Sequence, residues 1–210
     1  MRCSAALALC LVFGPGQAYG QRVADSGEPT VIYFVRHGEV EFIPPHFPLN
    51  TVGKRRAQAF ARTVTDVRFT HLFSSHTTRA RQMLETIAER QQLPIRQLPE
   101  PGSPIDGAIV DDRTPSRVAI PLLVEAIRAL PPGSTALVGV NSDNVFAILH
   151  GLGVPVASAE RACTTGGTCV PCLTNKCFPD RYDHLWILFL GPDGASPKLI
   201  ELRYGDAEPN

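Results

Sequence analysis

The sequence predicts an α/β fold in three layers, with a mainly parallel central sheet and helices on both of its faces. Two apolar runs, Val31–Val35 and Ala136–Val140, lack the alternation of a half-exposed strand. This pattern is typical of strands that are covered on both faces and have parallel neighbours. Other strands alternate with helical segments, which indicates right-handed crossovers between parallel strands. With 210 residues, the chain can form one such domain with a full core.

The first half of the chain contains the strands and helices expected at the start of this fold. After Val31–Val35, a proline-rich loop from Glu39 to Pro48 should lie over the carboxyl edge of the sheet. A helix begins near Asn50 and Thr51, either of which can cap it. The other elements expected here are a strand at Thr70–Ser74, a helix at Thr77–Gln92 and a strand at Pro94–Leu98.

The second half begins with a loop rich in Gly, Pro and Asp, from Glu100 to Arg113. The next helix ends before Pro131-Pro132-Gly133, which cannot continue it. Two apolar strands flank the turn residues Gly191 to Gly194, which predicts a closing hairpin. The elements expected here are a helix at Ser116–Leu130, the buried strand Ala136–Val140, a helix from about Asp143 to Leu152, and the hairpin strands Leu185–Leu190 and Lys198–Tyr204.

Residues 1–20 have the layout of a secretory signal peptide. Met1-Arg2 supplies one positive charge, Ala5 to Phe13 is continuously apolar, and Ala18-Tyr19-Gly20 offers a cleavage site. The apolar stretch is too short to span a bilayer. We therefore expect a periplasmic or secreted protein with no stable membrane insertion after signal removal, and an uncleaved anchor is the alternative. Residues 21–29 should form a flexible mature terminus, and residues 30–205 a single domain.

Four cysteines remain after the predicted signal peptide, within an insertion at about residues 155–179: Cys163, Cys169, Cys172 and Cys177. An exported protein meets an oxidising compartment, so an even set of cysteines favours two disulfides. Four clustered thiolates can instead bind zinc, because the C-x2-C step is a common chelating unit. Either arrangement would make the insertion a structural clasp beside the site entrance.

Charge composition excludes a global electrostatic function. Lys plus Arg and Asp plus Glu number 20 each, so no overall field favours nucleic acid or an anionic membrane. Any function that depends on charge must therefore come from local clusters of residues.

The tripeptide Arg36-His37-Gly38 directly follows the first buried strand. Ligands of open α/β sheets bind at this carboxyl edge. A second arginine, Arg79, follows the next strand along the chain, so two guanidiniums should meet at one point and can hold the oxygens of a phosphomonoester. Their charges should lower the pKa of His37 and keep its ring neutral. One ring nitrogen can attack phosphorus if the other donates to a backbone carbonyl.

An ordered set of segments resembles the histidine phosphatase superfamily, the family of phosphoglycerate mutase and acid phosphatases, and most closely its exported, single-domain bacterial members. The segments are Val31 to Gly38, Leu49-Asn-x-x-Gly53, Ser74-Ser75-x-x-x-Arg79-Ala80-x-Gln82, Ala136–Leu152 and Tyr182-Asp183-x-Leu185. The resemblance implies hydrolysis of phosphomonoesters through a phosphohistidine at His37, with Arg36 and Arg79 binding the phosphate. It implies no cofactor and no metal in the site.

One segment departs from the family pattern. The family has a second histidine in a V-G-H-S-N-T-like run, and the corresponding segment here is Val138-Gly139-Val140-Asn141-Ser142. Aligned without a gap, Asn141 takes the place of this histidine and is expected to contact the phosphate without a charge. The loss of one preorganised donor costs about 10²–10³ in rate. His46 and His76 are the two histidines that could reach the pocket instead.

The general acid is expected to be a carboxyl group in a loop over the site. Glu39 directly follows the tripeptide, and Asp106 lies in the loop after the third strand; these two are our candidates. Other carboxyl groups of the same loop are Glu100, Asp111 and Asp112.

Three functions remain open at this point. The first is an exported phosphatase, weakened by Asn141, that acts on a small phosphorylated substrate and releases inorganic phosphate. The second is a catalytically impaired protein that binds a phosphate ligand. The third is a structural or metal-handling envelope protein in which the cysteine insertion is the functional part. The sequence predicts no particular oligomeric state.

Overall fold

The computed structural model describes residues 27–155, 161–163, 169–171, 179, 181–192 and 195–205, with backbone only for residues 161–163 and 169–171. The predicted signal peptide at residues 1–20 lies outside this range. The disulfide-or-zinc alternatives also fall outside the described side chains, because they concern Cys163, Cys169, Cys172 and Cys177. No helix within the described residues is long and apolar enough to cross a membrane.

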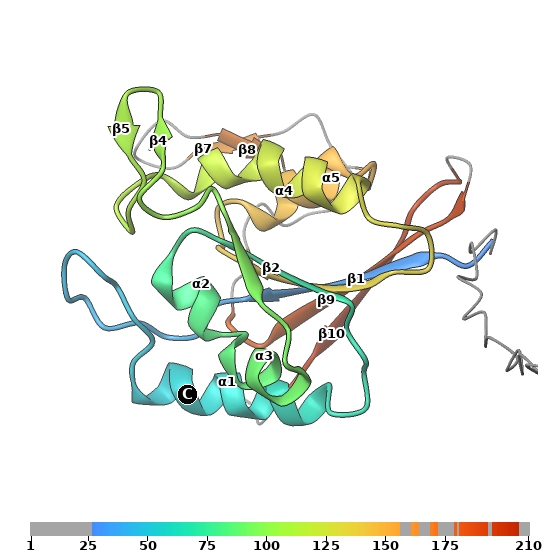
Figure 1. Cartoon of the computed structure of the whole chain (residues 1–210), viewed down its shortest axis with the longest axis horizontal. Helices are drawn as coiled ribbons and strands as arrows, with labels where there is room; N and C mark the ends of the chain where they lie inside the picture. Colours follow the sequence, from blue (N-terminus) through green and yellow to red (C-terminus); the bar gives the residue numbers. More distant parts are fainter. Residues whose placement is uncertain are drawn as a thin grey trace, which may run out of the picture.

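The predicted three-layer α/β fold is confirmed, with helices on both faces of a six-stranded sheet (Figure 1). The helices are α1 (Thr51–Thr63), α2 (Thr78–Gln82), α3 (Glu85–Gln91), α4 (Ala119–Arg128), α5 (Val145–Gly151) and the 3-10 turn η1 (Ser116–Val118). The strands are β1 (Thr30–Arg36), β2 (His71–Ser75), β3 (Ile95–Leu98), β4 (Pro104–Ile105), β5 (Ala108–Ile109), β6 (Thr135–Val140), β7 (Arg161–Cys163), β8 (Cys169–Pro171), β9 (His184–Leu190) and β10 (Lys198–Arg203).

The strand order of the main sheet is β10-β9-β1-β6-β2-β3. Strands β1, β6, β2 and β3 are parallel, and β9 and β10 continue the sheet in antiparallel pairing. Strand β1 is therefore central, as its apolar run predicts, and the closing hairpin is confirmed. The connections between the parallel strands carry the helices that cover the two faces.

Two apolar cores fill the space between the sheet and its helices. Alternate residues of β1 point to opposite faces: Phe34 packs in the core beneath α4 and α5, and Val35 in the core beneath α1 and α3. Both side chains have no exposed surface. Burial of an apolar side chain of this size contributes roughly 1.5–3 kcal/mol, so the two cores hold β1 from both sides.

The helix expected at Thr77–Gln92 is broken into α2 and α3. Met83 and Leu84 lie at the break and are both buried, at 1% and 0% exposure. A continuous helix would point neighbouring side chains about 100° apart, so the turn allows both to enter the same core. The break also shortens α2 to a single turn directly after β2.

Two further differences concern loops. The segment from Glu100 to Arg113 contains a short hairpin, β4–β5, where the sequence analysis expected only a loop. The insertion at about residues 155–179 contains the antiparallel pair β7–β8, in which Cys163 is opposite Cys169 in backbone register. Short strands of two or three residues carry too little apolar periodicity to be recognised from sequence.

Parallel pairing in register brings the ends of three strands to one line. Arg36 at the end of β1 is the partner of Val140 at the end of β6, and Gly139 of β6 pairs with Ser74 of β2. The residues that follow, His37, Asn141 and His76, consequently leave the sheet side by side.

Glycines let the first turns of α1 and α2 approach this edge. A Cβ atom on Gly53 would lie 2.2 Å from Glu39 O, and one on Gly139 would lie 2.6 Å from Ala80 O. Both distances are shorter than real Cβ contacts, so only glycine allows these helices to pack this closely against the strand ends.

Candidate active site

His37 lies at the carboxyl edge of the sheet with only 7% of its surface exposed. Its backbone N–H donates to Val140 O (3.0 Å), and ring atom Nδ1 lies 2.7 Å from Gly38 O. A carbonyl oxygen only accepts, so we assign the ring proton to Nδ1. The lone pair is then on Nε2, which is the tautomer required for an attacking imidazole.

The environment of His37 strongly favours the neutral ring. Burial is the largest effect, and together with the charges of Arg79 and Arg36 it lowers the pKa from 6.5 to about 3, against the opposing effect of the Gly38 carbonyl. The direction agrees with the sequence analysis, but burial contributes more than the arginine charges. His37 is therefore uncharged throughout the neutral and mildly acidic pH range.

Arg79 lies in α2 and contacts Asn141, which directly follows β6. We adopt the amide orientation of Asn141 that gives both neighbours a complementary partner. In it, Nδ2 donates to Ser75 Oγ (2.5 Å), and Oδ1 accepts from Arg79 Nε (3.3 Å) and Nη2 (3.0 Å). Asn141 is 2% exposed, and its backbone N–H donates to Asn144 Oδ1 (2.9 Å). Asn141 thus fixes the guanidinium of Arg79 beside the site.

Two carboxyl groups also act on Arg79. Burial lowers the pKa of Arg79, and the charges of Asp112 and Asp143 partly offset this effect. Asp143 accepts a hydrogen bond from Ser116 Oγ. Asp112 is 8% exposed, and its Oδ1 accepts from Thr78 N (2.6 Å), while its buried Oδ2 has no hydrogen-bond partner among the described residues.

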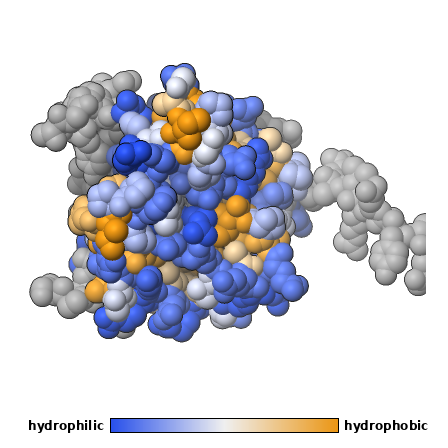
Figure 2. All heavy atoms as spheres, turned by 60° about the vertical axis from the view of Figure 1, so that its left-hand side comes forward, coloured by the Kyte–Doolittle hydropathy of each residue, from blue (hydrophilic) through white to orange (hydrophobic). Residues whose placement is uncertain are grey.

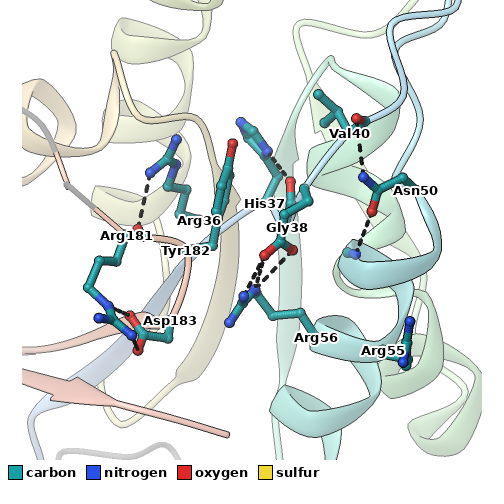
Figure 3. Close-up of polar contacts among 12 residues, drawn as sticks. Arg36, His37, Gly38, Val40, Asn50, Arg55, Arg56, Arg181, Tyr182 and Asp183 are labelled. Carbon is teal, nitrogen blue, oxygen red and sulfur yellow. Dashed lines mark hydrogen bonds and ion pairs between the residues drawn. The ribbon is translucent and has the colours of Figure 1, made fainter. Parts of the chain in front are cut away.

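Arg36 and His37 flank the ring of Tyr182 (Figure 3). The Arg36 guanidinium donates from Nη1 to Pro179 O and to Arg181 O, both at 3.1 Å, and its Cζ lies 4.1 Å from the Tyr182 ring centroid. Both arginines that the sequence analysis placed at this point act on His37, but to different extents. Arg79 has the larger effect on the pKa of His37, and Arg36 contributes less.

Tyr182 is a site residue that the sequence analysis did not identify. Its ring centroid lies 5.9 Å from that of His37, and Arg56 Cζ lies 5.9 Å from the same ring. Tyr182-Asp183 belongs to a segment quoted for the family resemblance, but no local pattern in the sequence indicates that this tyrosine returns to the end of β1. Only the antiparallel pairing of β9 with β1 brings it there.

Glu39 is a poor general acid, contrary to our expectation. Arg56 Nη2 lies 2.5 Å from Oε1 of Glu39, and Arg56 Nε contacts both carboxylate oxygens at 3.2 and 3.0 Å. Burial acts to raise the pKa of Glu39, but these hydrogen bonds and the charge of Arg56 outweigh it, so the pKa lies below its usual value. An ionised carboxylate that is held by arginine has no proton to donate.

Asp106 and the two extra histidines are not joined to His37 by any contact of the described residues. Asp106 is exposed at the turn between β4 and β5, with φ of 50°. His46 is exposed in the loop after β1. His76 is buried, and its Nε2 donates to Thr114 O (2.9 Å), which turns the ring toward the loop before η1.

The face of the molecule at the carboxyl ends of the strands is mostly hydrophilic, with separate apolar patches (Figure 2). The most exposed large apolar side chains of the described residues include Phe42 (84%) and Ile109 (64%). They belong to the loop after β1 and to the β4–β5 hairpin, which flank this face in Figure 1. A polar face suits a ligand that carries charge.

Solved structures with the same fold include three hydrolases. Mycobacterial hydrolase 1 is 15% identical with a TM-score of 0.53, and the alignment covers 86% of this chain and all of that one. A mycobacterial glucosyl-3-phosphoglycerate phosphatase is 14% identical with a TM-score of 0.52, over 86% of this chain and all of that one. The protein histidine phosphatase SixA, complexed with tungstate, is 17% identical with a TM-score of 0.51, over 83% and 97%. A comparison with curated proteins gives no match.

A comparison with family models matches residues 32–100 to the histidine phosphatase superfamily (branch 1). The matched range contains the tripeptide Arg36-His37-Gly38 and Arg79. This part of the chain therefore matches the histidine phosphatase superfamily. Asn141 and Tyr182 lie outside the matched range, so the part of the site that departs from the family pattern also lies outside it.

The lowered pKa of His37 predicts a specific dependence of stability on pH. The unfolded histidine binds a proton near pH 6.5, whereas the folded one does so only near pH 3. As the pH falls from 6.5, protons bind preferentially to the unfolded state, so this group lowers the unfolding free energy by about 1.4 kcal/mol per pH unit. We expect the free energy of unfolding, measured by urea unfolding between pH 4 and 7, to fall less steeply with decreasing pH for His37→Gln than for the unchanged protein.

His150→Gln is the matched control, because His150 is exposed on α5. This variant should keep the pH dependence of the unchanged protein. If the unfolding free energy of His37→Gln depended on pH as steeply as that of the unchanged protein, burial would not lower the pKa of His37.

Proposed function

We propose that the protein is an exported phosphomonoester hydrolase that acts through a phosphohistidine on His37. The observation that carries the proposal is the neutral His37 ring, whose Nδ1–H is held by Gly38 O beside two arginines. Named neighbours of the same fold support it: SixA was solved with tungstate, and the mycobacterial phosphatase with inorganic phosphate and with VO3. The substrate would be a small phosphorylated molecule, and residues 1–20 would direct the chain to the periplasm or outside the cell.

The burial of His37 restricts the kind of ester. With 7% of the residue exposed, the ring can be reached by a terminal phosphoryl group more easily than by a phosphorus atom that carries two large substituents. A phosphomonoester also has close to two negative charges, which Arg79 and Arg36 can neutralise. This favours monoesters over diesters.

In the first step, His37 Nε2 attacks phosphorus, the N–P bond forms, and the bond from phosphorus to the ester oxygen breaks. The leaving oxygen takes a proton from a carboxylic acid. In the second step, water attacks the phosphohistidine, the N–P bond breaks, and the same group, now a carboxylate, accepts a proton from the water. Inorganic phosphate then leaves the site.

Asp112 is the carboxyl group that we assign to this proton transfer. Glu39 is bound by Arg56, Asp111 is bound by Arg113, and Asp106 is exposed at a turn. Asp112 is buried beside Arg79, and its Oδ2 has no hydrogen-bond partner within the described part of the chain. Among the loop carboxyl groups considered, it is therefore the one with an oxygen available close to the phosphate-binding arginine.

The second candidate function is a protein that binds phosphate without turnover, and Asn141 is the observation that favours it. Asn141 carries no charge, and its amide is engaged by Arg79 and Ser75. Asp112 and Asp143 further reduce the positive charge around Arg79. A site with less positive charge stabilises the transition state less well.

Turnover of p-nitrophenyl phosphate separates the two candidates. The purified mature protein should release p-nitrophenol, and His37→Ala should lower the rate by at least about 10³-fold, because the nucleophile is lost. Asn141→His should raise the rate by about 10²-fold, since it adds a charged donor for the phosphoryl oxygens. If the unchanged protein does not exceed His37→Ala between pH 4 and 8, the enzyme proposal fails and the binding function gains support.

The role of Asp112 predicts a dependence on the leaving group. Asp112→Asn keeps the oxygen that accepts from Thr78 N but has no proton to give. It should lower turnover of alkyl phosphates by about 10²-fold and change turnover of p-nitrophenyl phosphate little, because nitrophenolate leaves without a proton. Steady-state kinetics with both substrates check this, and Asp106→Asn is the matched control. Equal losses with both substrates would assign Asp112 to structure instead.

A further inference from the structure

We propose that Tyr182 is a catalytic residue whose hydroxyl group donates a hydrogen bond to the phosphoryl group on its way to and from His37. This inference rests on the proposed function and adds a donor that Asn141 cannot supply alone. The family resemblance includes the segment that contains Tyr182 but assigns this residue no role, so the assignment comes from its position between His37 and Arg36.

The ring of Tyr182 is surrounded by the groups that define the site. Arg36 Cζ lies 4.1 Å and Arg56 Cζ 5.9 Å from its centroid, and the His37 ring is 5.9 Å away. Figure 3 shows the ring standing between Arg36 and His37, with its hydroxyl end directed to the same side as the His37 ring. A hydrogen-bond donor is therefore placed beside the nucleophile.

Tyr182 is also within electrostatic range of Arg79, the second arginine of the site. Tyr182 is one of the groups whose charge acts on the pKa of Arg79, after burial, Asp112 and Asp143. Tyr182 thus joins the two halves of the site, since its ring packs on Arg36 and its oxygen is within electrostatic range of Arg79. An anion bound by Arg79 beside His37 would meet this hydroxyl.

The backbone around Tyr182 is firmly held, which a catalytic donor requires. Tyr204 donates from its hydroxyl to Tyr182 O (3.1 Å) and from its backbone N–H to Asp183 O (3.1 Å). The Asp183 carboxylate is bound by Arg181 at 3.1 Å and by Arg203 at 2.6 Å. The start of β9 is therefore fixed, and only two side-chain torsions of Tyr182 remain to be set.

If Tyr182 had only a structural role, its aromatic ring would be sufficient and its hydroxyl group would not be needed. The ring covers the guanidinium of Arg36 in a cation–π contact, with Cζ 4.1 Å from the ring centroid. Phenylalanine retains this contact and lacks only the hydroxyl, so Tyr182→Phe distinguishes the two roles. Tyr33→Phe is the matched control, because Tyr33 is also half-buried but packs edge-on against Phe69 at 5.4 Å, within the core beneath α1 and α3.

The experiment measures three quantities for the unchanged protein, Tyr182→Phe and Tyr33→Phe. These are kcat and KM with p-nitrophenyl phosphate, and the dissociation constant of orthovanadate by calorimetry. We expect Tyr182→Phe to lower kcat by about 10²-fold with KM changed less than threefold, and to weaken vanadate binding about tenfold or more. Tyr33→Phe should match the unchanged protein in all three quantities.

The outcomes separate this inference from the proposed function. If the unchanged protein turns over and Tyr182→Phe equals it in kcat and vanadate affinity, the role of the hydroxyl is overturned while the phosphatase proposal stands. If the unchanged protein shows no turnover, the dissociation constants of orthovanadate are compared. Weaker binding by Tyr182→Phe than by the unchanged protein supports the contact of the hydroxyl group with the phosphoryl group. Equal binding, or no binding to the unchanged protein, overturns it.

Discussion

The in-register parallel pairing of β1, β6 and β2 is the constraint on which the rest of the site depends. Because Arg36 pairs with Val140 and Ser74 with Gly139, the residues after each strand leave the sheet together. The hydrogen bond from His37 N to Val140 O extends this ladder by one residue, so that His37 and Asn141 leave the sheet at neighbouring positions. A shift of one residue in register would turn these side chains to the opposite face.

The site contains a buried histidine, His37, and two arginines, Arg79 and Arg36, whose charges are offset to different extents by their neighbours. Burial removes His37 from water and keeps it neutral, and the nearby arginines reinforce this effect. Arg79 is surrounded by Asn141, Asp112 and Asp143, whereas Arg36 is bound to backbone carbonyls beneath Tyr182. The positive charge available to a phosphoryl group is consequently smaller than two arginines alone would indicate. Uncharged hydrogen-bond donors such as the Tyr182 hydroxyl group are therefore needed to stabilise the phosphoryl oxygens.

Much of the fold was predictable from sequence because buried parallel strands and helix caps have local signals. The run Val31–Val35 gave the central strand, and Asn50 caps α1 through its bond to Gly53 N, as expected. Arg36, His37 and Arg79 were recognisable for a related reason, since Arg36 and His37 lie at the end of one strand that the sequence marks clearly and Arg79 lies in the helix after another. The break at Met83 and Leu84 was not predictable, because it depends on how both side chains enter one core.

Residues that reach the site through tertiary structure could not be identified from sequence. Tyr182 arrives by antiparallel pairing of β9, and Asp112 arrives from a loop that packs on α2. Glu39 illustrates the opposite error: proximity in sequence to His37 indicated an acid, but the partner Arg56 from α1 keeps its carboxylate ionised. The sequence gives the position of a residue along the chain, whereas the contacts that it makes in the fold determine its protonation state and its role.

The most direct measurement is the location of the phosphoryl group during turnover. The protein would be mixed with p-nitrophenyl phosphate, quenched in alkali within milliseconds to preserve phosphohistidine, digested and analysed by tandem mass spectrometry. The account predicts a phosphoryl group on His37 that forms and decays at rates consistent with kcat. Turnover without a phosphorylated peptide, or with the phosphoryl group on another residue such as His76, would contradict it.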